Sequence, residues 1–407
     1  MLNEVKARSS FNIEHSTLNI QHLLLTLDAH AVHVLSIIIL AAWILAFVRT
    51  IVNLVLIPRL RADGPAAREP FVSVIIPARD EARIIERTVR AFLAQTYPNL
   101  EVVVVNDRSV DGTGEILHAI DDGRLRVIDG IEPPEGWLGK PWALHQGSRL
   151  AKGELLLFVD ADVVYAPAAV RAAVAFLERR RPAFLSLLPY FEMQGFGENA
   201  AMPMLAMFCF TFMPTWISNR SRFAALAIGG GTGNLIVRER YEAIGGHEAL
   251  KDSVVDDVAL ARLVRRSGGA TETVRADDLV SLRMYHGLAE VVEGFTKNAF
   301  AVFGRNYVAG ILIQVGAVVF HLLPYGLALA GDRISMATVI VIVVTRLILF
   351  RSLRYRLDNA LLLHPLMVGI WTWIFVRSMW ITGIRRKLLW RGRTYDARQT
   401  RFGAERR

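Results

Sequence analysis

The stretch 155-LLLFVDADVVYA-166 decides the fold, because it joins a strand of buried character to two carboxylates. Residues 155–159 are apolar enough for an interior β-strand, and Asp160 and Asp162 follow at once. Residues i and i+2 of an extended chain point to the same side, so both carboxylates can face one small volume. Two like charges in one place indicate either a bound cation or a solvated loop.

Strand-like and helix-like segments alternate on both sides of this stretch. Short β-branched runs are typical of strands, and longer segments with apolar residues three or four apart are typical of helices. The predicted strands are 71–77, 101–107, 124–128 and 154–162, and the predicted helices are 81–98, 112–120 and 141–151. Such alternation predicts an α/β fold with a mainly parallel sheet and with chemistry at the carboxyl ends of its strands. Asp107, Asp160 and Asp162 all fall there.

The composition indicates a membrane protein. The chain has 407 residues, of which 53% are hydrophobic, more than is usual for a soluble domain. Four apolar stretches stand out, at 32–57, 308–330, 334–350 and 360–382. About 20 apolar residues cross a bilayer, so the first, second and fourth stretches are long enough and the third is marginal. The first is interpreted as an anchor, because Pro58 and basic residues follow it instead of a cleavage site.

The excess positive charge lies at the carboxyl end. Residues 383–407 contain nine basic and two acidic residues, a net charge of +7 in a chain of net charge +9. A basic tail beside an apolar segment favours an anionic membrane surface over nucleic acid as partner. Arg59, Arg61 and Arg68 follow the first apolar stretch, which places the next residues in the cytoplasm by the positive-inside rule. The single Cys209 agrees with a reducing compartment.

The membrane topology predicted from these stretches conflicts with the charge of the tail. If all three carboxyl-terminal stretches cross, the basic tail lies outside, against the positive-inside rule. Either 334–350 or the segment that begins at His364 and Pro365 does not fully span, or the tail is an exception.

The chain divides into four predicted parts. They are an anchored amino-terminal segment at 1–58, a cytosolic catalytic domain at 70–300, membrane helices at 308–382 and a basic tail at 383–407. Residues 200–217, rich in Met and Phe, are expected either at the membrane interface or in a core helix. Arg49, Arg346 and Arg377 lie close to the ends of apolar stretches and are expected to snorkel to the interface.

Several polar residues are compatible with chemistry and also with ordinary structure. Asp107 ends a strand, where an acid can bind a nucleotide, whereas Asp111 stands in an Asp-Gly pair typical of turns. Lys140 precedes a helix whose N-terminus favours anions, and is either a phosphate ligand or a surface lysine. Asp256 and Asp257 begin a helix, where the macrodipole explains one acid and leaves the other available as a general base.

A divalent cation would account for the opening acidic pair. Mg²⁺ and Mn²⁺ bind carboxylate oxygens such as those of Asp160 and Asp162 and leave positions for substrate phosphates. The glycine-rich stretch 229–246 either lets the backbone approach a ligand or forms a turn before a helix. Within it, Arg238 or Arg240 can face a phosphate or the membrane.

Taken in order, these motifs resemble family 2 glycosyltransferases. The motifs are 74-VIIPARDE-81, 105-VNDRSVDGT-113, 139-GKPWALHQG-147, 159-VDADV-163, the glycines of 229–246 and 256-DDVALARLVRRSG-268. The resemblance covers roughly residues 71–268. It implies a nucleotide-sugar-binding GT-A fold, a preference for a UDP-sugar as donor, and inversion of the sugar's anomeric configuration.

The resemblance also implies site residues. For the nucleotide sugar they are Pro77, Glu81, Asp107, Asp111, Lys140 and Asp160, for the metal ion Asp160 and Asp162, and for general base catalysis Asp257 with Asp256 beside it. The family often has Asn-Glu, Asp-Asp and Glu-Asp where this chain has Asp80-Glu81, Asn106-Asp107 and Asp256-Asp257. The last difference leaves open which acid is the base.

The acceptor is suggested by motifs outside this core. Polymer-making members carry Gln-x-x-Arg-Trp after the base, whereas this chain reads 293-EGFTKNAF-300, so one sugar per acceptor is expected. The stretches 283-RMYHGLAEVVEGFTKNAF-300 and 389-LWRGRTYDAR-398 resemble bacterial membrane glycosyltransferases encoded with carotenoid or hopanoid synthesis. They imply a polyisoprenoid-type lipid acceptor in the bacterial cell membrane, met by a cytoplasmic catalytic domain.

Three alternatives stay open at this point. A polysaccharide-type synthase would use the same donor site for repeated transfer. A sugar nucleotidyltransferase would use the same strand-end acids and metal, but would join a sugar phosphate to a free nucleoside triphosphate. A non-enzymatic membrane scaffold or transporter would need no acids at strand ends.

Overall fold

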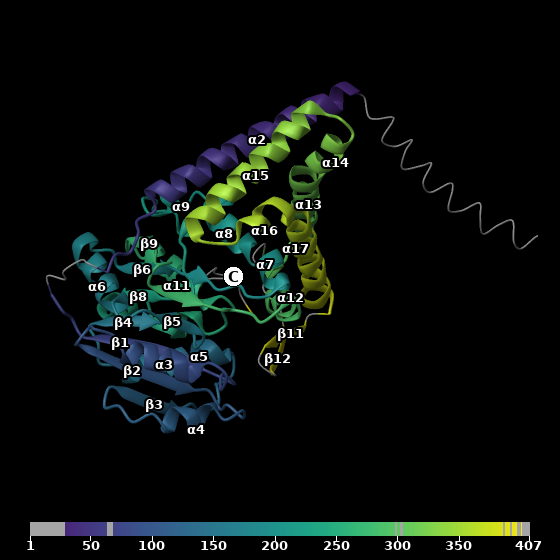
Figure 1. Ribbon diagram of the computed structural model, residues 1–407. Helices are drawn as coiled ribbons and strands as arrows, with labels where there is room; N and C mark the ends of the chain where they lie inside the picture. The colour runs from purple at the N-terminus through teal and green to yellow at the C-terminus, as the bar shows by residue number, and fades with distance from the viewer. Residues whose placement is uncertain are drawn as a thin grey trace, which may run out of the picture.

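The computed structural model describes residues 29–62, 68–297, 299–301, 304–385, 387–390, 393–396 and 400. Figure 1 shows an α/β part, drawn blue to green, beneath a group of long helices at the two ends of the described chain. Of the predicted tail, the described residues form a short hairpin of β11 (Lys387–Trp390) and β12 (Arg393–Asp396).

A seven-stranded mixed sheet forms the centre of the α/β part. The strands are β1 (Val72–Ala78), β2 (Leu100–Asn106), β3 (Leu125–Asp129), β4 (Leu155–Phe158), β6 (Phe184–Leu188), β8 (Asn234–Val237) and β9 (Thr271–Arg275). Their order is β3-β2-β1-β4-β8-β6-β9, in which β1 to β4 are parallel and β8 is antiparallel to both its neighbours. The β-branched residues of β1 and β2 are buried because helices cover both faces.

The two faces of the sheet carry different helices. Val74 and Ile76 of β1 face one layer and Ile75 faces the other, as the alternation along a strand requires. The first layer contains α3 (Ile85–Leu93), α4 (Thr113–His118) and α6 (Ala169–Arg180), and the second contains α5 (Gly139–Leu150), α10 (Arg238–Ala243), η3 (Gly246–Leu250) and α11 (Asp256–Arg266). All predicted strands and helices of this domain are present: β1, β2 and β3 are shifted by one residue, α5 begins two residues earlier, and α3, α4 and β4 are shorter than predicted.

One strand boundary differs from the prediction in a way that concerns the site. β4 ends at Phe158, so Asp160 and Asp162 lie in a turn and not on an extended strand. The expectation that strand alternation aligns the two carboxylates is therefore wrong. The turn leads into β5 (Val163–Tyr165), which forms a second sheet with β10 (Val280–Leu282) and β7 (Tyr190–Phe191).

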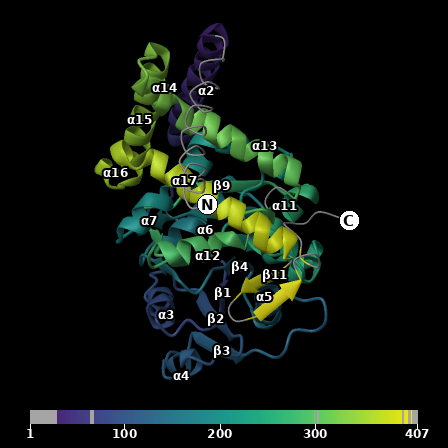
Figure 2. The ribbon, with the colours of Figure 1, turned by 90° about the vertical axis from the view of Figure 1, so that its right-hand side faces the viewer.

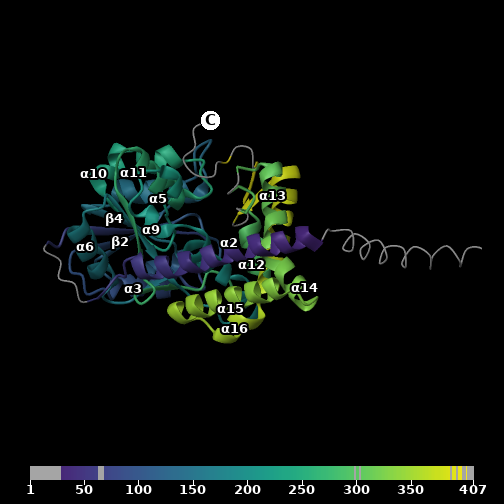
Figure 3. The same cartoon turned by 90° about the horizontal axis from the view of Figure 1, so that it is seen from above.

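All four apolar stretches are helical. They form α2 (Ala29–Leu56), α13 (Tyr307–Ala317) with η5 (Val318–Leu322) and α14 (Leu323–Leu329), α15 (Arg333–Leu353), and α17 (His364–Ser378) with η6 (Met379–Ile384). By length and composition, the described chain has four helices able to cross a membrane, and the third, predicted as marginal, runs for 21 residues. Figures 1 and 3 both show α2 and α15 side by side.

The last helix returns along the path of α13. At the start of α17, His364 Nε2 lies 3.3 Å from Nδ1 of His321, which is fourteen residues after the start of α13. At the end of η6, Gly383 lies against the side chain of Tyr307, the first residue of α13. The short α16 (Leu357–Leu362) folds back on α15, and Arg346 of α15 contacts its carbonyl groups. Residues 356–384 therefore enter the bundle at the end nearest the catalytic domain and leave at that same end.

Arg346 does not snorkel, contrary to the prediction. Its side chain is only 1% exposed, and its guanidinium donates to the carbonyl oxygens of Asn359 (2.9 Å) and Ala360 (3.0 Å). Arg49 and Arg377 also bond within the protein, to the Phe212 carbonyl and the Thr296 hydroxyl. These arginines join segments of the bundle to one another.

The Met- and Phe-rich segment predicted at 200–217 lies between the bundle and the sheet. It forms α7 (Phe196–Ala201), α8 (Pro203–Met207), the π-helix η1 (Phe208–Phe212) and α9 (Thr215–Ser218), and the 3₁₀ helix η2 (Ala224–Leu226) follows. Asn53 near the end of α2 donates to the carbonyls of Phe210 and Met213. Figure 2 shows α12 (Leu288–Thr296) and α17 crossing above the strands, which adds a second wall to the same region.

Candidate active site

One cavity of about 500 Å³ lies between the carboxyl ends of the central strands and the helices above them. Eight of the nine site residues expected from the sequence line it: Pro77, Glu81, Asp107, Lys140, Asp160, Asp162, Asp256 and Asp257. Asp111 is not among the lining residues. Residues 150 positions apart in sequence thus meet in one volume, as the edge of a parallel sheet allows.

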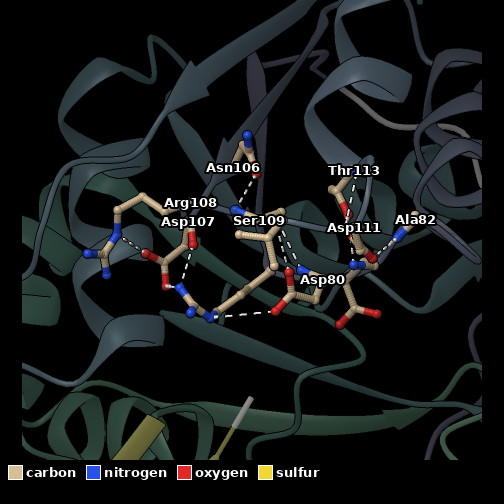
Figure 4. Close-up of polar contacts among 11 residues, drawn as sticks. Asp80, Ala82, Asn106, Asp107, Arg108, Ser109, Asp111 and Thr113 are labelled. Carbon is tan, nitrogen blue, oxygen red and sulfur yellow. Dashed lines mark hydrogen bonds and ion pairs between the residues drawn. The ribbon is translucent and has the colours of Figure 1, made fainter. Parts of the chain in front are cut away.

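The loop after β1 is held to the loop after β2 by reciprocal hydrogen bonds (Figure 4). Asp80 Oδ1 accepts from the Val110 amide at 2.9 Å, and the Asp80 amide donates to the Ser109 hydroxyl at 3.0 Å. Asp80 adopts a left-handed backbone conformation with φ 54°. Asp80 therefore has a structural role in joining the two loops.

Asp111 belongs to the same hydrogen-bond network between the loops after β1 and β2. Its Oδ2 accepts from the Ala82 amide at 2.9 Å, and its Oδ1 accepts from the Thr113 amide at 3.1 Å. The Thr113 hydroxyl in turn accepts from the Glu81 amide at 2.8 Å. These bonds lower the pKa of Asp111 even though burial raises it. Asp111 therefore fixes the position of Glu81 from outside the cavity.

Asp107 is flanked by two arginines. It is only 4% exposed, with Arg108 Nε 3.4 Å from Oδ1 and Arg79 Nη1 3.8 Å from Oδ2. Arg79 also donates to the Asp107 carbonyl at 2.8 Å. The charge of the buried carboxylate is thus compensated at the end of β2, where an acceptor for a nucleotide base or ribose was expected.

Lys140 connects the two acidic pairs. Its Nζ lies 2.6 Å from Asp160 Oδ1 and 3.5 Å from Asp256 Oδ1, and its side chain is 17% exposed. Burial alone lowers the pKa of Lys140, but Asp160, Asp256 and Asp257 together raise it well above its usual value. The surface-lysine alternative is therefore wrong: Lys140 is a buried cation among four acids.

Asp162 makes no ion pair with Lys140 among the described residues. Burial, followed by the charges of Asp160 and Glu81, raises the pKa of Asp162 to about 7, although the charge of Lys140 opposes this rise. Its Oδ1 is buried and has no hydrogen-bond partner among the described residues. An orphaned carboxylate oxygen next to a second carboxylate is a fitting donor set for a hard cation completed by substrate oxygens. Within the described residues no group of three or more such ligands exists, so a cation would need those substrate oxygens.

The second acidic pair, Asp256 and Asp257, also has one carboxylate with a lowered pKa and one with a raised pKa. Asp256 is 4% exposed, and although burial raises its pKa, the charge of Lys140 and the interaction with His247 bring that pKa below its usual value. His247 Nε2 lies 3.8 Å from Asp256 Oδ2, and burial lowers the pKa of His247. Burial and the charges of Asp256 and Asp160 raise the pKa of Asp257 to about 6, although Lys140 opposes them. Asp257 is the more basic carboxylate of the pair.

Glycines allow the two pairs to come together. A Cβ on Gly231 would lie 1.9 Å from Asp160 Oδ2, and one on Gly229 would lie 2.1 Å from the Asp257 carbonyl. The backbone of Gly229 and Gly231 therefore packs directly against Asp257 and Asp160. These glycines are needed for this close approach and not only for a turn. Arg238 donates to the Gly153 carbonyl and is not among the cavity residues, so it does not contact the site.

The other end of the cavity is apolar. Its lining residues are Leu188, Phe191, Leu205, Ala206, Phe208, Phe210, Leu282, Met284, Tyr285, Phe295, Leu353 and Tyr355. The sequence analysis identified none of them as site residues individually, and the Met- and Phe-rich composition of 200–217 was the one available signal. Arg275 and Asp277, also missed, form a buried ion pair at 3.0 Å in this wall.

Comparison with known proteins agrees with this architecture. Residues 73–242 match the model of glycosyl transferase family 2. Residues 73–242 are therefore a family 2 glycosyltransferase domain. The chain is 27% identical over 354 residues to 4,4'-diaponeurosporenoate glycosyltransferase of Staphylococcus aureus (strain MRSA252), covering 83% of this chain and 92% of the relative.

A solved structure supports the fold of the glycosyltransferase. The mannosyltransferase PcManGT from Pyrobaculum calidifontis, in complex with GDP-Man and Mn²⁺, superposes with a TM-score of 0.54 at 20% identity and covers 85% of this chain and 97% of its own. The predicted GT-A fold is confirmed, as is the predicted enzyme class. The scaffold and nucleotidyltransferase alternatives are not supported by these matches.

Proposed function

We propose that this glycosyltransferase transfers one sugar from a nucleoside-diphosphate sugar to a lipid that stays in the membrane. The observation that carries the proposal is one cavity lined both by charged residues at the strand ends and by apolar side chains, several of them from the segment between the sheet and the bundle and from α12. A charged donor and an apolar acceptor require such a division, because each end desolvates only the matching part of a ligand.

The donor would bind at the charged end. Pro77, Glu81 and Asp107 would surround the nucleoside, and Lys140 lies at the start of α5, where amide groups favour the diphosphate. Asp160 and Asp162 would hold a divalent cation, Mg²⁺ or Mn²⁺. When bound, this cation would neutralise charge on the departing diphosphate. UDP is the nucleotide that the sequence resemblance favours, whereas the similar mannosyltransferase is in complex with GDP-Man.

Asp257 would act as the general base. It lines the cavity, its Oδ1 accepts from the adjacent Val258 amide at 2.7 Å, and its pKa of about 6 suits proton transfer near neutral pH. The acceptor hydroxyl or carboxyl oxygen would attack the anomeric carbon as its proton, where present, passes to Asp257. The bond to the diphosphate breaks in the same displacement, so the anomeric configuration inverts.

The acceptor would enter along the apolar wall. A polyisoprenoid such as a carotenoid or hopanoid fits this wall by chemistry, and the curated relative is a diaponeurosporenoate glycosyltransferase. Residues 1–58 and 308–382 would embed the protein in the bacterial cell membrane, with the domain at 70–300 in the cytoplasm. If residues 356–384 re-enter from the cytoplasmic side, the basic tail at 383–407 lies inside, and the conflict with the positive-inside rule disappears.

The test uses the full chain purified in detergent with a panel of nucleotide sugars, with and without Mn²⁺. Acceptors are a carotenoid carboxylic acid, a hopanoid alcohol and an extracted bacterial lipid mixture, with products identified by mass spectrometry. We expect one donor to be consumed only with metal and one lipid to gain a single sugar. Transfer of several sugars to one acceptor would instead support the polysaccharide-type alternative.

A pair of variants tests the apolar end separately. Phe208→Glu places a charge in the apolar wall, whereas Phe223→Glu makes the same change at a residue that is 77% exposed and outside the cavity. The first variant should lose lipid glycosylation and keep hydrolysis of the nucleotide sugar, and the second should keep both. Equal lipid transfer by both variants would contradict the acceptor assignment.

A further inference from the structure

A second cavity, separate from the catalytic one except for Asp277, opens where the membrane helices meet the catalytic domain. It measures about 670 Å³ and is lined by Arg59, Asp277, Asp278, Leu347, Ile348, Arg351, Ser352, Arg354 and Leu357. Arg59 follows the end of α2, and Arg351 and Arg354 stand at the end of α15. Figures 1 and 3 show these two helices running together.

The charges of this cavity are not balanced. Asp277 pairs with Arg275 at 3.0 Å, and Asp278 pairs with Arg354 at 2.7 Å, so both carboxylates already have a cation. Arg59 and Arg351 make no ion pair within the described residues. Two arginines are therefore available to an anion at this place.

Apart from Ser352, the other lining residues are apolar, and two of them belong to the membrane helix α15. Leu347 and Ile348 are on the last turns of α15, which is apolar and long enough to span a bilayer. A ligand in this cavity would place its charged group on the arginines and its apolar part along α15. A soluble phosphate compound has no apolar part to pack on Leu347 and Ile348. A phospholipid has both a phosphate for the arginines and acyl chains for these apolar residues.

We propose that this cavity binds one anionic phospholipid of the cytoplasmic leaflet, with its phosphate between Arg59 and Arg351. The site differs from the acceptor region in its side chains: the two cavities share Asp277 and take alternate residues around the end of α15, with Leu353 and Tyr355 lining the acceptor region. The bound lipid joins the carboxyl ends of α2 and α15 at the point where Arg354 contacts both Asp277 and Asp278. Asp277 also accepts hydrogen bonds from Arg275, which lines the catalytic cavity. The bound lipid therefore stabilises the contact between the catalytic domain and its membrane helices.

The test is native mass spectrometry of the delipidated full chain in a neutral detergent. Phosphatidylglycerol or phosphatidylcholine is added in steps, and in a third arm inorganic phosphate is added without lipid. We expect one phosphatidylglycerol to bind at least about tenfold more tightly than phosphatidylcholine, since each arginine near an anionic lipid contributes roughly a factor of five. Inorganic phosphate should neither bind with comparable affinity nor displace the lipid.

Matched variants locate the site. Arg59→Gln with Arg351→Gln should bring the affinity for phosphatidylglycerol down to that for phosphatidylcholine, and Arg351→Gln alone should give a partial loss if the double variant does not fold. Arg220→Gln with Arg222→Gln removes the same charge from an exposed loop outside the cavity and should keep the preference. Equal binding of the two lipids, an unchanged preference in both cavity variants, or displacement by phosphate would overturn the proposal.

Discussion

The two members of each acidic pair in the catalytic cavity are alike in sequence and unlike in the structure. Asp160 and Asp162 follow β4, whereas Asp256 and Asp257 begin α11. In each pair the first acid contacts the Lys140 ammonium and the second does not, and the second has a raised pKa. In each pair, Lys140 therefore forms an ion pair with one carboxylate and leaves the other with a raised pKa.

This difference teaches how one site obtains two kinds of carboxylate. A raised pKa marks a group whose charge is not satisfied by the protein alone, and such groups gather at functional sites. Asp162 has an orphaned oxygen suited to a cation, whereas Asp257 can take a proton near neutral pH. The following predictions test that division.

The largest effect is expected at the first pair. Asp162→Asn and Asp160→Asn should each lower metal-dependent transfer by about 10³-fold or more, since lost charge neutralisation of a leaving group costs several kcal/mol. Steady-state transfer against Mn²⁺ concentration measures this. Asp121→Asn, an equal change at an exposed residue outside the cavity, should have no effect. Near-normal turnover of either cavity variant would disprove the metal site.

The second pair should separate catalysis from stability. Asp257→Asn should lower the turnover number by about 10²–10⁴-fold, the usual contribution of a general base. It should not lower the melting temperature, because a neutral amide removes a poorly solvated charge. Asp256→Asn should lower the melting temperature, because it removes the buried carboxylate that lies beside both Lys140 and His247. The reverse pattern would make Asp256 the base.

A glycine substitution tests the geometry that brings the pairs together. Gly231→Ala places a Cβ 1.9 Å from Asp160 Oδ2 and must displace that carboxylate, so transfer should fall by about 10²-fold. Gly230→Ala is the matched control, because the nearest atom to its Cβ, Thr232 Oγ1, is 3.6 Å away. Equal activities of the two variants would show that the position of Asp160 is not critical.

The pH dependence follows from the raised pKa of Asp257. A base must be deprotonated, so kcat/KM should rise with pH through a midpoint no higher than about 6 and then level off. The value at pH 5 should be up to about tenfold below the plateau, the full factor applying to a midpoint of about 6. Lys140→Met removes the cation that lowers this pKa and should move the midpoint upward. A profile without an acidic limb would exclude Asp257 as the base.

The smallest effect is expected at Asp111, outside the cavity. Asp111→Ala removes the acceptor for the Ala82 and Thr113 amides, so the loop that carries Glu81 loosens. We expect KM for the donor to rise a few-fold with little change in the turnover number, since a hydrogen bond to a charged group contributes about 1.5–3 kcal/mol and part of it is recovered by water. A large fall in turnover with unchanged KM would place Asp111 in the reaction itself.

Much of the architecture is predictable from the sequence, because it depends on local patterns. The β-branched runs at β1 and β2 and the helical spacing of 85–93 predict strand and helix by period alone. The apolar stretches predict all four long helices by length. The order of acidic and glycine motifs also predicts which residues line the cavity, since parallel strands bring their carboxyl ends to one edge.

The tertiary structure decided what these residues do to one another. Lys140 looks like any lysine before a helix, and only packing against Asp160 and Asp256 makes it a buried cation. Arg346 looked free to reach the interface, yet the fold of α16 surrounds it with carbonyl groups. The apolar wall combines residues from segments far apart in the chain, which no local pattern records. Sequence fixes periodicity and charge, whereas burial and the distance between charges, which set a pKa, exist only after the chain has folded.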